Sequence, residues 1–136
     1  MPLSDDAQLA LIVEDNPDNM LLTKAVLRRA GYRTLEARSA EEALEQIEGC
    51  TPDLMLMDIQ LPGQDGLSLT RQLRGTARLS SVPIIALSAH AMHESQAEAL
   101  AAGCDGYITK PIDTRAFAEQ LSSALASSQR RLSRAS

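Results

Sequence analysis

The sequence predicts an α/β protein of the doubly wound class, in which helices cover both faces of a five-stranded, mostly parallel sheet. Two observations predict this class. Short apolar runs that end abruptly at polar or turn-forming residues alternate five times with longer segments of helical spacing. The chain also has 136 residues, the usual length of a single domain. Strands that alternate with helices join into right-handed βαβ units and hence into a parallel sheet.

The start of the chain predicts a strand, a helix and a second strand. The apolar run at 10–13 is too short for a helix and stops at the turn formers 14–17, so it indicates a buried strand. A helix is expected from about 17 to 30, because apolar residues recur there at helical spacing and Gly31 provides a C-cap. The second strand is expected at 32–37.

The next stretch predicts the second helix and the third strand. Ser39 and Glu42 have the spacing of a capping box, and the helix that they begin is expected to stop at Gly49. Residues 54–57 form another continuous apolar run, which ends at Asp58 and indicates a third buried strand.

The rest of the chain repeats the alternation. A loop that contains Pro62, Gly63 and Gly66 leads into a third helix, which ends near Arg74. The later elements are expected as a strand at 83–87, a helix at 94–102 capped by Gly103, a strand at 107–109 and a helix at 113–125.

This pattern predicts one folded domain between two tails. Residues 1–7 are interpreted as an N-terminal tail and residues 8–126 as the domain. Residues 127–136 are rich in serine, carry three arginines and lack apolar periodicity, so a disordered, solvated tail is expected there. The length leaves no room for a separate output domain, so we expect the protein to act through contact with other proteins.

Composition excludes several classes of partner. The chain is 44% apolar and 23% charged, with a formal charge of −5, which is typical of soluble globular proteins. No apolar run approaches the ~18 residues of a membrane span, and the first residues do not resemble a signal peptide, so a cytoplasmic protein is expected. Aromatic residues are scarce and acids are in excess, so neither nucleic acid nor membrane is an expected partner.

The cysteines and histidines predict no metal site of their own. Cys50 and Cys104 lie far apart without metal-ligand spacing, so both are expected to be small, buried or half-buried thiols. His90 and His93 flank the start of a helix and have no third ligand near them in the sequence.

Polar side chains follow four of the five predicted strands where each strand ends. Glu14 and Asp15 follow the first strand, Asp58 the third, Ser88 the fourth and Lys110 the fifth. Each of them alone could be a helix cap or a solvated surface residue. Because the carboxyl ends of parallel strands meet at one edge of the sheet, we expect these five residues to converge on a ligand site.

The residue types at this edge predict a cation and a phosphoryl group. Three crowded carboxylates repel one another, so we expect raised pKa values and a bound cation. Carboxylate oxygens without His or thiolate neighbours favour Mg²⁺, with Mn²⁺ as an alternative. Of the 13 basic residues only Lys24 and Lys110 are lysines, and a compact ammonium beside a hydroxyl suits the oxygens of a phosphoryl group.

Four segments carry a resemblance to a known family. They read LIVEDN at 11–16, LMDIQLPGQDG at 56–66, ALSAHA at 86–91 and GYITKPI at 106–112. In this order and at these spacings they resemble the CheY-like receiver domain of two-component response regulators, over residues 8–126, and in particular its stand-alone members. The resemblance implies the flavodoxin-like strand order 2-1-3-4-5.

The resemblance also implies roles for the residues at the sheet edge. Asp58 would accept a phosphoryl group, while Asp15, Asp58 and the backbone carbonyl of Gln60 would hold Mg²⁺ with help from Glu14 through water. Ser88 and Lys110 would contact the phosphoryl oxygens, and Tyr107 would change rotamer with Ser88 as the switch. The remaining implications are that Gln60 and His90 set the lifetime of the phosphoryl group and that the Lys110–Pro111 bond is cis. Glu14 replaces the commoner aspartate of the acid pair.

The resemblance further implies a signalling protein rather than an enzyme. The phosphoryl donor would be a sensor histidine kinase or a histidine phosphotransfer protein, and the protein would assist its own phosphorylation and dephosphorylation. A downstream protein would bind the face formed by residues 93–102, 106–109 and 114–125. The alternative is an enzyme with an aspartyl nucleophile, a phosphatase or phosphotransferase, but such enzymes need a second acid two residues after the nucleophile, where Gln60 stands. A nucleotide-binding protein is excluded, because no glycine-rich phosphate-binding motif occurs.

Overall fold

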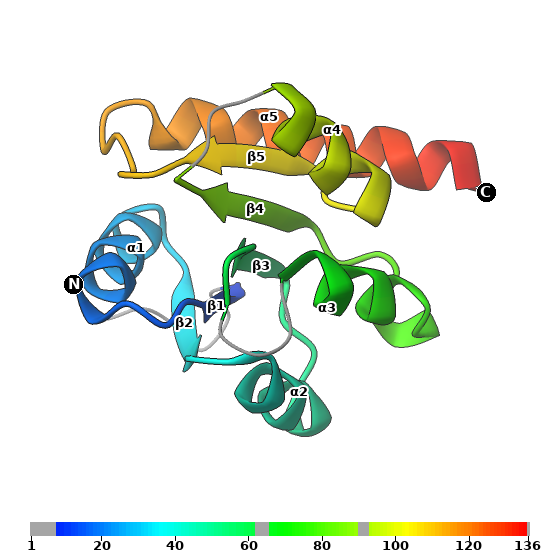
Figure 1. The fold of residues 1–136 in the computed structure, drawn as a ribbon, viewed down its shortest axis with the longest axis horizontal. Coiled ribbons are helices and arrows are strands. Elements are labelled where there is room, and N and C mark those ends of the chain that lie inside the picture. Colours follow the sequence, from blue (N-terminus) through cyan, green and yellow to red (C-terminus); the bar gives the residue numbers. More distant parts are fainter. Residues whose placement is uncertain (1–7, 62–65, 90–92, 136) are drawn as a thin grey trace.

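The computed structural model describes residues 8–61, 66–89 and 93–135. Within these ranges five strands form one parallel sheet in the order β2-β1-β3-β4-β5 (Figure 1). The predicted class and strand order are therefore confirmed. The strands are β1 (Leu9–Val13), β2 (Arg33–Ala37), β3 (Leu54–Asp58), β4 (Ile84–Ser88) and β5 (Gly106–Thr109).

The helices follow the predicted alternation, with small shifts at most of their ends. The side chains of Asn16 and Ser39 cap the first two helices by accepting hydrogen bonds from the backbone N–H groups of Asn19 and Glu42, respectively. The helices are α1 (Pro17–Arg29), α2 (Ala40–Gly49), α3 (Gly66–Arg74), α4 (His93–Ala102) and α5 (Phe117–Ala135), with a short 3-10 turn, η1 (Ala77–Leu79), before β4.

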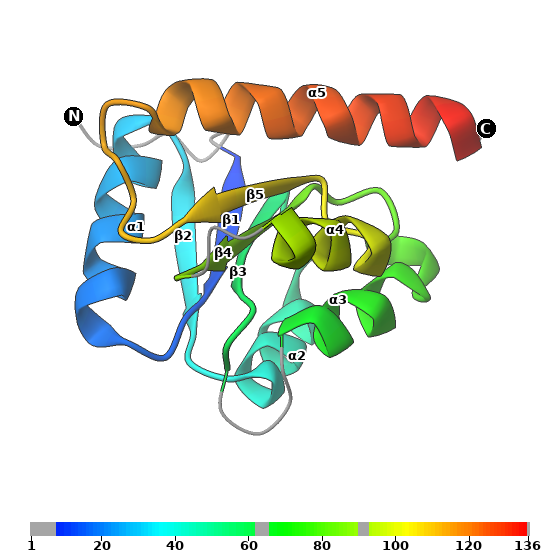
Figure 2. The ribbon, with the colours of Figure 1, turned by 45° about the horizontal axis from the view of Figure 1, so that its top comes forward.

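All strands except β2 divide their side chains between two hydrophobic clusters, one on each face of the sheet. In β1, Leu11 and Val13 join the cluster under α2, α3 and α4, whereas Ala10 and Ile12 join the cluster under α1 and α5. This explains why the central strands are apolar at consecutive positions, since both of their faces are buried. The two helical layers are visible on either side of the sheet in Figures 1 and 2.

The expectation of a disordered tail from residue 127 is wrong for the described residues. Helix α5 continues without a break to Ala135 (Figure 2). Ser128 is buried, and the half-buried Leu125 and Leu132 lie three residues before it and four residues after it. The apolar spacing therefore does continue past residue 126, but a serine at the central position conceals it.

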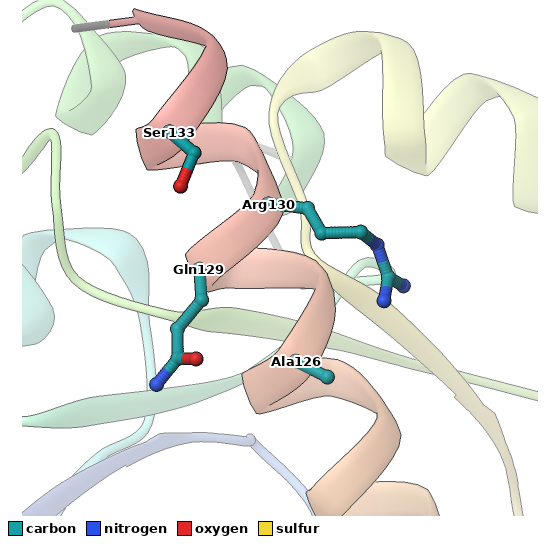
Figure 3. Close-up of a pocket in the computed structure, with 4 residues that line it drawn as sticks. All are labelled: Ala126, Gln129, Arg130 and Ser133. Carbon is teal, nitrogen blue, oxygen red and sulfur yellow. The ribbon is translucent and has the colours of Figure 1, made fainter.

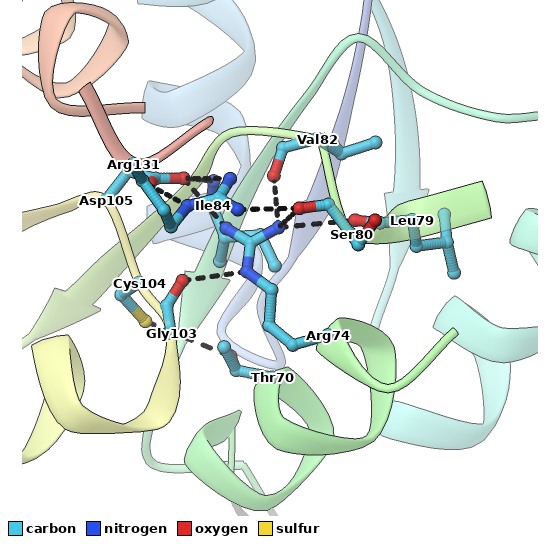
Figure 4. A network of polar contacts seen from close by, with 10 residues as sticks. All are labelled: Thr70, Arg74, Leu79, Ser80, Val82, Ile84, Gly103, Cys104, Asp105 and Arg131. Atoms are coloured by element: carbon cyan, nitrogen blue, oxygen red, sulfur yellow. Dashed lines mark hydrogen bonds and ion pairs between the residues drawn. The ribbon is translucent and has the colours of Figure 1, made fainter. Parts of the chain in front are cut away.

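A polar network holds this C-terminal part of α5 against the domain (Figure 4). The buried Asp105 carboxylate accepts hydrogen bonds from Arg131 Nε at 2.7 Å and from Arg74 Nη2 at 2.8 Å. Arg131 Nη1 also donates to the Ser80 carbonyl at 2.6 Å. Because Asp105 also accepts the Ile84 N–H at 3.1 Å, the network joins α5 to α3 and to the beginning of β4.

None of the described helices is long and apolar enough to cross a lipid bilayer.

Candidate functional site

The carboxylates of Glu14, Asp15 and Asp58 meet at the carboxyl ends of β1 and β3. Glu14 directly follows β1, and its N–H continues the sheet by donating to the Ala37 carbonyl at 2.9 Å. Asp58 is the last residue of β3. Glu14 and Asp58 are buried, with 1% and 2% of their surface exposed, whereas Asp15 is exposed. The site therefore has a buried acidic floor and one carboxylate that reaches solvent.

Lys110 lies between the two buried acids. Its Nζ donates to both carboxylate oxygens of Glu14, at 2.9 and 3.0 Å, and to Asp58 Oδ2 at 2.9 Å. The Lys110 N–H donates to the Ser88 carbonyl at 2.7 Å, which continues the β4–β5 ladder past the end of β5. The Lys110–Pro111 peptide bond is cis, as the family resemblance predicted.

The three charged groups shift one another's pKa values. Burial, together with a hydrogen bond to Asp58, raises the pKa of Glu14 to about 7. Burial acts in the same direction on Asp58, but hydrogen bonds with Glu14, the Gln60 N–H and Lys110 outweigh it and lower the pKa of Asp58. Burial acts to lower the pKa of Lys110, but its hydrogen bonds to both acids raise it. The expectation that crowding raises the pKa of each carboxyl is therefore correct for Glu14 and wrong for Asp58.

The donor set fits a small divalent cation. Glu14, Asp15 and Asp58 can each offer one carboxylate oxygen, and these three oxygens lie within 4.8 Å of one another. Oxygen ligands of this kind suit Mg²⁺, which takes one or two protein carboxylates and completes its shell with water and phosphate oxygens. Because Asp15 is exposed, water could reach a cation held by these carboxylates.

Gln60 contacts the Asp58 carboxylate, Ser88 ends the neighbouring strand β4, and Tyr107 lies on β5. The Gln60 N–H donates to Asp58 Oδ1 at 2.8 Å, so both oxygens of this carboxylate are engaged. Ser88 is fully buried at the end of β4. Tyr107 is half-buried on β5 and packs against the cluster under α2, α3 and α4. His90 lies outside the described residues.

Asn19 and Gly66 also belong to the site, and sequence reasoning missed both of them. A hydrogen bond with the Asn19 side chain lowers the pKa of Glu14 and partly offsets the effect of burial. Gly66 begins α3 and donates its N–H to the carbonyl of Ile59, the residue after Asp58, at 3.2 Å. Asn19 carries no signal in the sequence, since it reads as an ordinary residue in the first turn of a helix.

The cysteines take no part in this site. Both thiols are free, Cys50 half-buried and Cys104 buried, as predicted. Burial raises the pKa of Cys104 to about 11, which keeps this thiol protonated and unreactive near neutral pH.

A surface hollow on α5 lies at the other end of the strands. It is lined by Ala126, Gln129, Arg130 and Ser133 (Figure 3). The neighbouring Arg131 pairs with Asp105, which precedes β5, whereas the three carboxylates follow β1 and β3. None of its lining residues carries a carboxylate or imidazole, so this hollow has no chemistry comparable to that of the sheet edge.

Comparison with known proteins agrees with this geometry. The polar-differentiation response regulator DivK of Brucella ovis is 42% identical over 115 residues, which are 85% of this chain and 94% of that protein. A CheY-like response regulator receiver domain protein from Methanospirillum hungatei has a solved structure with a TM-score of 0.79 and 29% identity, over 93% of this chain and 99% of that one.

A third relative carries a metal ion. The receiver domain of the sensor histidine kinase PA1611 from Pseudomonas aeruginosa was solved with a magnesium ion coordinated in its active-site cleft. It matches with a TM-score of 0.75 and 37% identity, over 83% of this chain and 93% of that one. The family model of the response regulator receiver domain matches residues 10–122. The sheet order, the acidic site and these matches together show that the chain belongs to the response regulator receiver domain family.

Proposed function

We propose that this protein accepts a phosphoryl group on Asp58 in a Mg²⁺-dependent reaction and signals through the altered surface of the phosphorylated form. The observation that carries the proposal is the Lys110 ammonium, which lies 2.9 Å from Asp58 and 2.9 Å from Glu14 in a buried site. Together with hydrogen bonds from Glu14 and the Gln60 N–H, this cation lowers the pKa of Asp58, and the carboxylate, not the carboxylic acid, is the nucleophile.

The transfer would proceed from the phosphohistidine of a sensor kinase or phosphotransfer protein. An oxygen of the Asp58 carboxylate attacks phosphorus, the P–N bond to the imidazole breaks, and the imidazole nitrogen keeps the electron pair. After the transfer, the Lys110 ammonium would contact a phosphoryl oxygen in place of the Asp58 carboxylate oxygen and neutralise its charge. The buried Ser88 hydroxyl is the second partner that we assign to the phosphoryl oxygens.

Mg²⁺ bound by Asp15, Asp58 and the Gln60 carbonyl, with Glu14 assisting through water, would supply the remaining positive charge for the phosphoryl oxygens. The oxygen donors of Glu14, Asp15 and Asp58 support this assignment. We propose Mn²⁺ as an alternative ion, because it also prefers oxygen ligands.

The downstream partner is proposed to bind the face formed by α4, β5 and α5. Ser88 lies opposite Thr109 in the β4–β5 register, and Ala86 lies opposite Tyr107. A Ser88 hydroxyl drawn toward a phosphoryl group on Asp58 would vacate space for the Tyr107 ring, which couples the charge at the sheet edge to this face. Gln60 and His90 are proposed to tune the lifetime of the phosphoryl group, and a cytoplasmic location stays a prediction.

The test is phosphorylation by acetyl phosphate and by a phosphorylated histidine phosphotransfer domain, each with Mg²⁺, with Mn²⁺ and with EDTA. We expect one phosphoryl group per chain that is cleaved by base and by hydroxylamine, located at Asp58 by borohydride reduction, and no label in Asp58→Asn or in EDTA. Asp53→Asn is the matched control, because it removes an aspartate from the amino end of β3. Continuous turnover of varied phosphoesters would instead support an enzyme with an aspartyl nucleophile.

A further inference from the structure

Gly66, the first residue of α3, lies directly against the peptide of the proposed phosphoacceptor. A Cβ atom built on Gly66 would be 2.4 Å from the Asp58 carbonyl oxygen and 2.7 Å from Ile59 Cα. Both of these are backbone atoms, which cannot swing aside as the end of a side chain can. The glycine is therefore required by a close approach of two backbones.

Other residues of α3 hold the backbone at Gly66 in place. Leu69 and Leu73 of α3 are buried in the core, and the Thr70 hydroxyl donates to the Gly66 carbonyl at 2.8 Å. Thr70 is itself fully buried and accepts a weak hydrogen bond from Cys104 Sγ at 3.9 Å (Figure 4). Because these contacts hold α3 in the core, we expect a methyl group on Gly66 to displace the Asp58–Ile59 peptide.

The direction of the Asp58 carboxylate depends on that peptide. Its two oxygens are held by the Gln60 N–H at 2.8 Å and by Lys110 Nζ at 2.9 Å. A shift of the Asp58–Ile59 peptide by a few tenths of an ångström would lengthen both hydrogen bonds. Misplacing a reacting group in this way slows the reaction. We propose that Gly66 is a positioning residue for the phosphoacceptor: the missing side chain lets α3 close on the Asp58–Ile59 peptide and aims the carboxylate. This inference rests on the proposed function of Asp58.

The test compares Gly66→Ala with a matched glycine variant away from Asp58. A Cβ at Gly106 would be 2.7 Å from the Ala124 Cβ, so Gly106→Ala is also overpacked but against a side chain of α5. Both variants should lose stability in urea. At a temperature where both are folded, Gly66→Ala should take label from acetyl phosphate roughly tenfold more slowly than wild type, and Gly106→Ala within about twofold.

A second readout is independent of phosphorylation. The Gln60 N–H is hydrogen-bonded to Asp58, so its hydrogen exchange reports the position of the carboxylate. In EDTA, hydrogen exchange at the Gln60 N–H should be faster in Gly66→Ala than in wild type and unchanged in Gly106→Ala. If wild type takes no label, the proposed function fails, while exchange at Gln60 still decides the positioning role. If folded Gly66→Ala takes label and exchanges its Gln60 N–H at the wild-type rates, the positioning role of Gly66 is overturned.

Thr70→Val is the milder variant if Gly66→Ala does not fold. It preserves the side-chain shape and removes the hydroxyl that holds the Gly66 carbonyl. We expect labelling to be roughly threefold slower and hydrogen exchange at the Gln60 N–H to be faster, since a hydrogen bond that holds the Gly66 backbone is lost. Unchanged labelling and exchange in Thr70→Val would then overturn the inference.

Discussion

Lys110 and Glu14 show how single residues set the chemistry of this site. Lys110 compensates two buried acids at once, yet the two acids respond in opposite ways: the pKa of Glu14 is raised and that of Asp58 is lowered. Burial, followed by the hydrogen bond to Asp58, therefore dominates at Glu14, and Asp58 remains the ionised partner. This division suits a site in which one carboxylate reacts and the other supports it.

The raised pKa of Glu14 predicts a pH dependence of stability in EDTA. An acid whose pKa is higher in the folded than in the unfolded state stabilises the fold when protonated, so stability falls as pH rises between about 4.5 and about 7. The lowered pKa of Asp58 contributes stability that is lost only when the pH falls below 3.8, the ordinary pKa of this group. The raised pKa of Lys110 contributes stability that is lost only when the pH rises above 10.5. We expect a loss on the order of 2 kcal/mol from pH 5 to pH 8.

Urea unfolding followed by circular dichroism measures this loss. Glu14→Gln should abolish most of it and should be more stable than wild type at pH 8. Glu48→Gln, which changes an exposed glutamate of α2, should leave it intact. A pH profile that is identical in wild type and Glu14→Gln would contradict the prediction.

Lys110→Met tests the ammonium against the metal ion. Removing one partner of a buried ion pair leaves the other charges uncompensated, so we expect a loss of about 3 kcal/mol in EDTA. Saturating Mg²⁺ should recover most of the loss, because it supplies a cation to the same carboxylates in the native state only.

The measurement is the Mg²⁺-induced rise in melting temperature, which should be larger in Lys110→Met than in wild type. The control is Lys24→Met, which breaks the more exposed Lys24–Glu36 pair at 3.4 Å and should cost less than about 1 kcal/mol with or without Mg²⁺. An equal or smaller rise in Lys110→Met would show that the ammonium and the ion do not share these carboxylates.

At the scale of elements, the C-terminal part of α5 is the feature that departs most from the expectation. The family match ends at residue 122, whereas the helix continues to Ala135. Arg131 connects this part of the helix to Asp105 at the start of β5 and to the Ser80 carbonyl before β4. The extension is therefore anchored to the amino ends of two strands of the sheet.

Arg131→Ala should loosen this anchor. It removes charge-assisted hydrogen bonds to a buried carboxylate, and because the Arg131 side chain is 29% exposed we expect a modest loss of about 1–2 kcal/mol. Arg130→Ala is the matched control, since Arg130 is exposed and its hydrogen bond to the Ser127 hydroxyl is local. Helical signal at 222 nm should fall in the first variant only; an equal signal in both would argue against the anchor.

At the scale of the whole molecule, the switch requires that a charge at Asp58 be felt at the α4–β5–α5 face. Helix α4 is suited to movement because it carries few large anchoring side chains: among its described side chains Ala99 and Ala102 are buried, while the largest, Leu100, is 57% exposed. Helix α5, by contrast, is held by Phe117, Leu121 and the Arg131 anchor. We therefore expect the rearrangement to concentrate in α4 and β5.

Amide chemical shifts on addition of beryllofluoride and Mg²⁺ measure this coupling. Changes should extend from residues near Asp58 and Ser88 to Tyr107 and α4, and should be smaller in the C-terminal half of α5. Ser88→Ala removes the hydroxyl that links the two regions and should confine the changes to the sheet edge. Changes that stay near Asp58 in the wild-type protein would exclude the coupling.

The sequence by itself determined the alternation of strands and helices and the five polar residues that follow the strands. These features are local: apolar runs, capping side chains and glycine stops act over a few residues. The convergence of Glu14, Asp58 and Lys110 could be predicted as well, because parallel strands bring their carboxyl ends to one edge.

Only the tertiary structure decided which groups touch. The pairing of Lys110 with both acids and the opposite pKa shifts of Glu14 and Asp58 join residues distant in the sequence. The contact of Gly66 with the Asp58 peptide joins residues only eight positions apart, but it brings the first residue of α3 against the end of β3. The helical end of α5 depends likewise on Asp105, 26 residues before Arg131. Such contacts depend on distances of a few tenths of an ångström and on burial, and a pattern of residue types along the chain specifies neither.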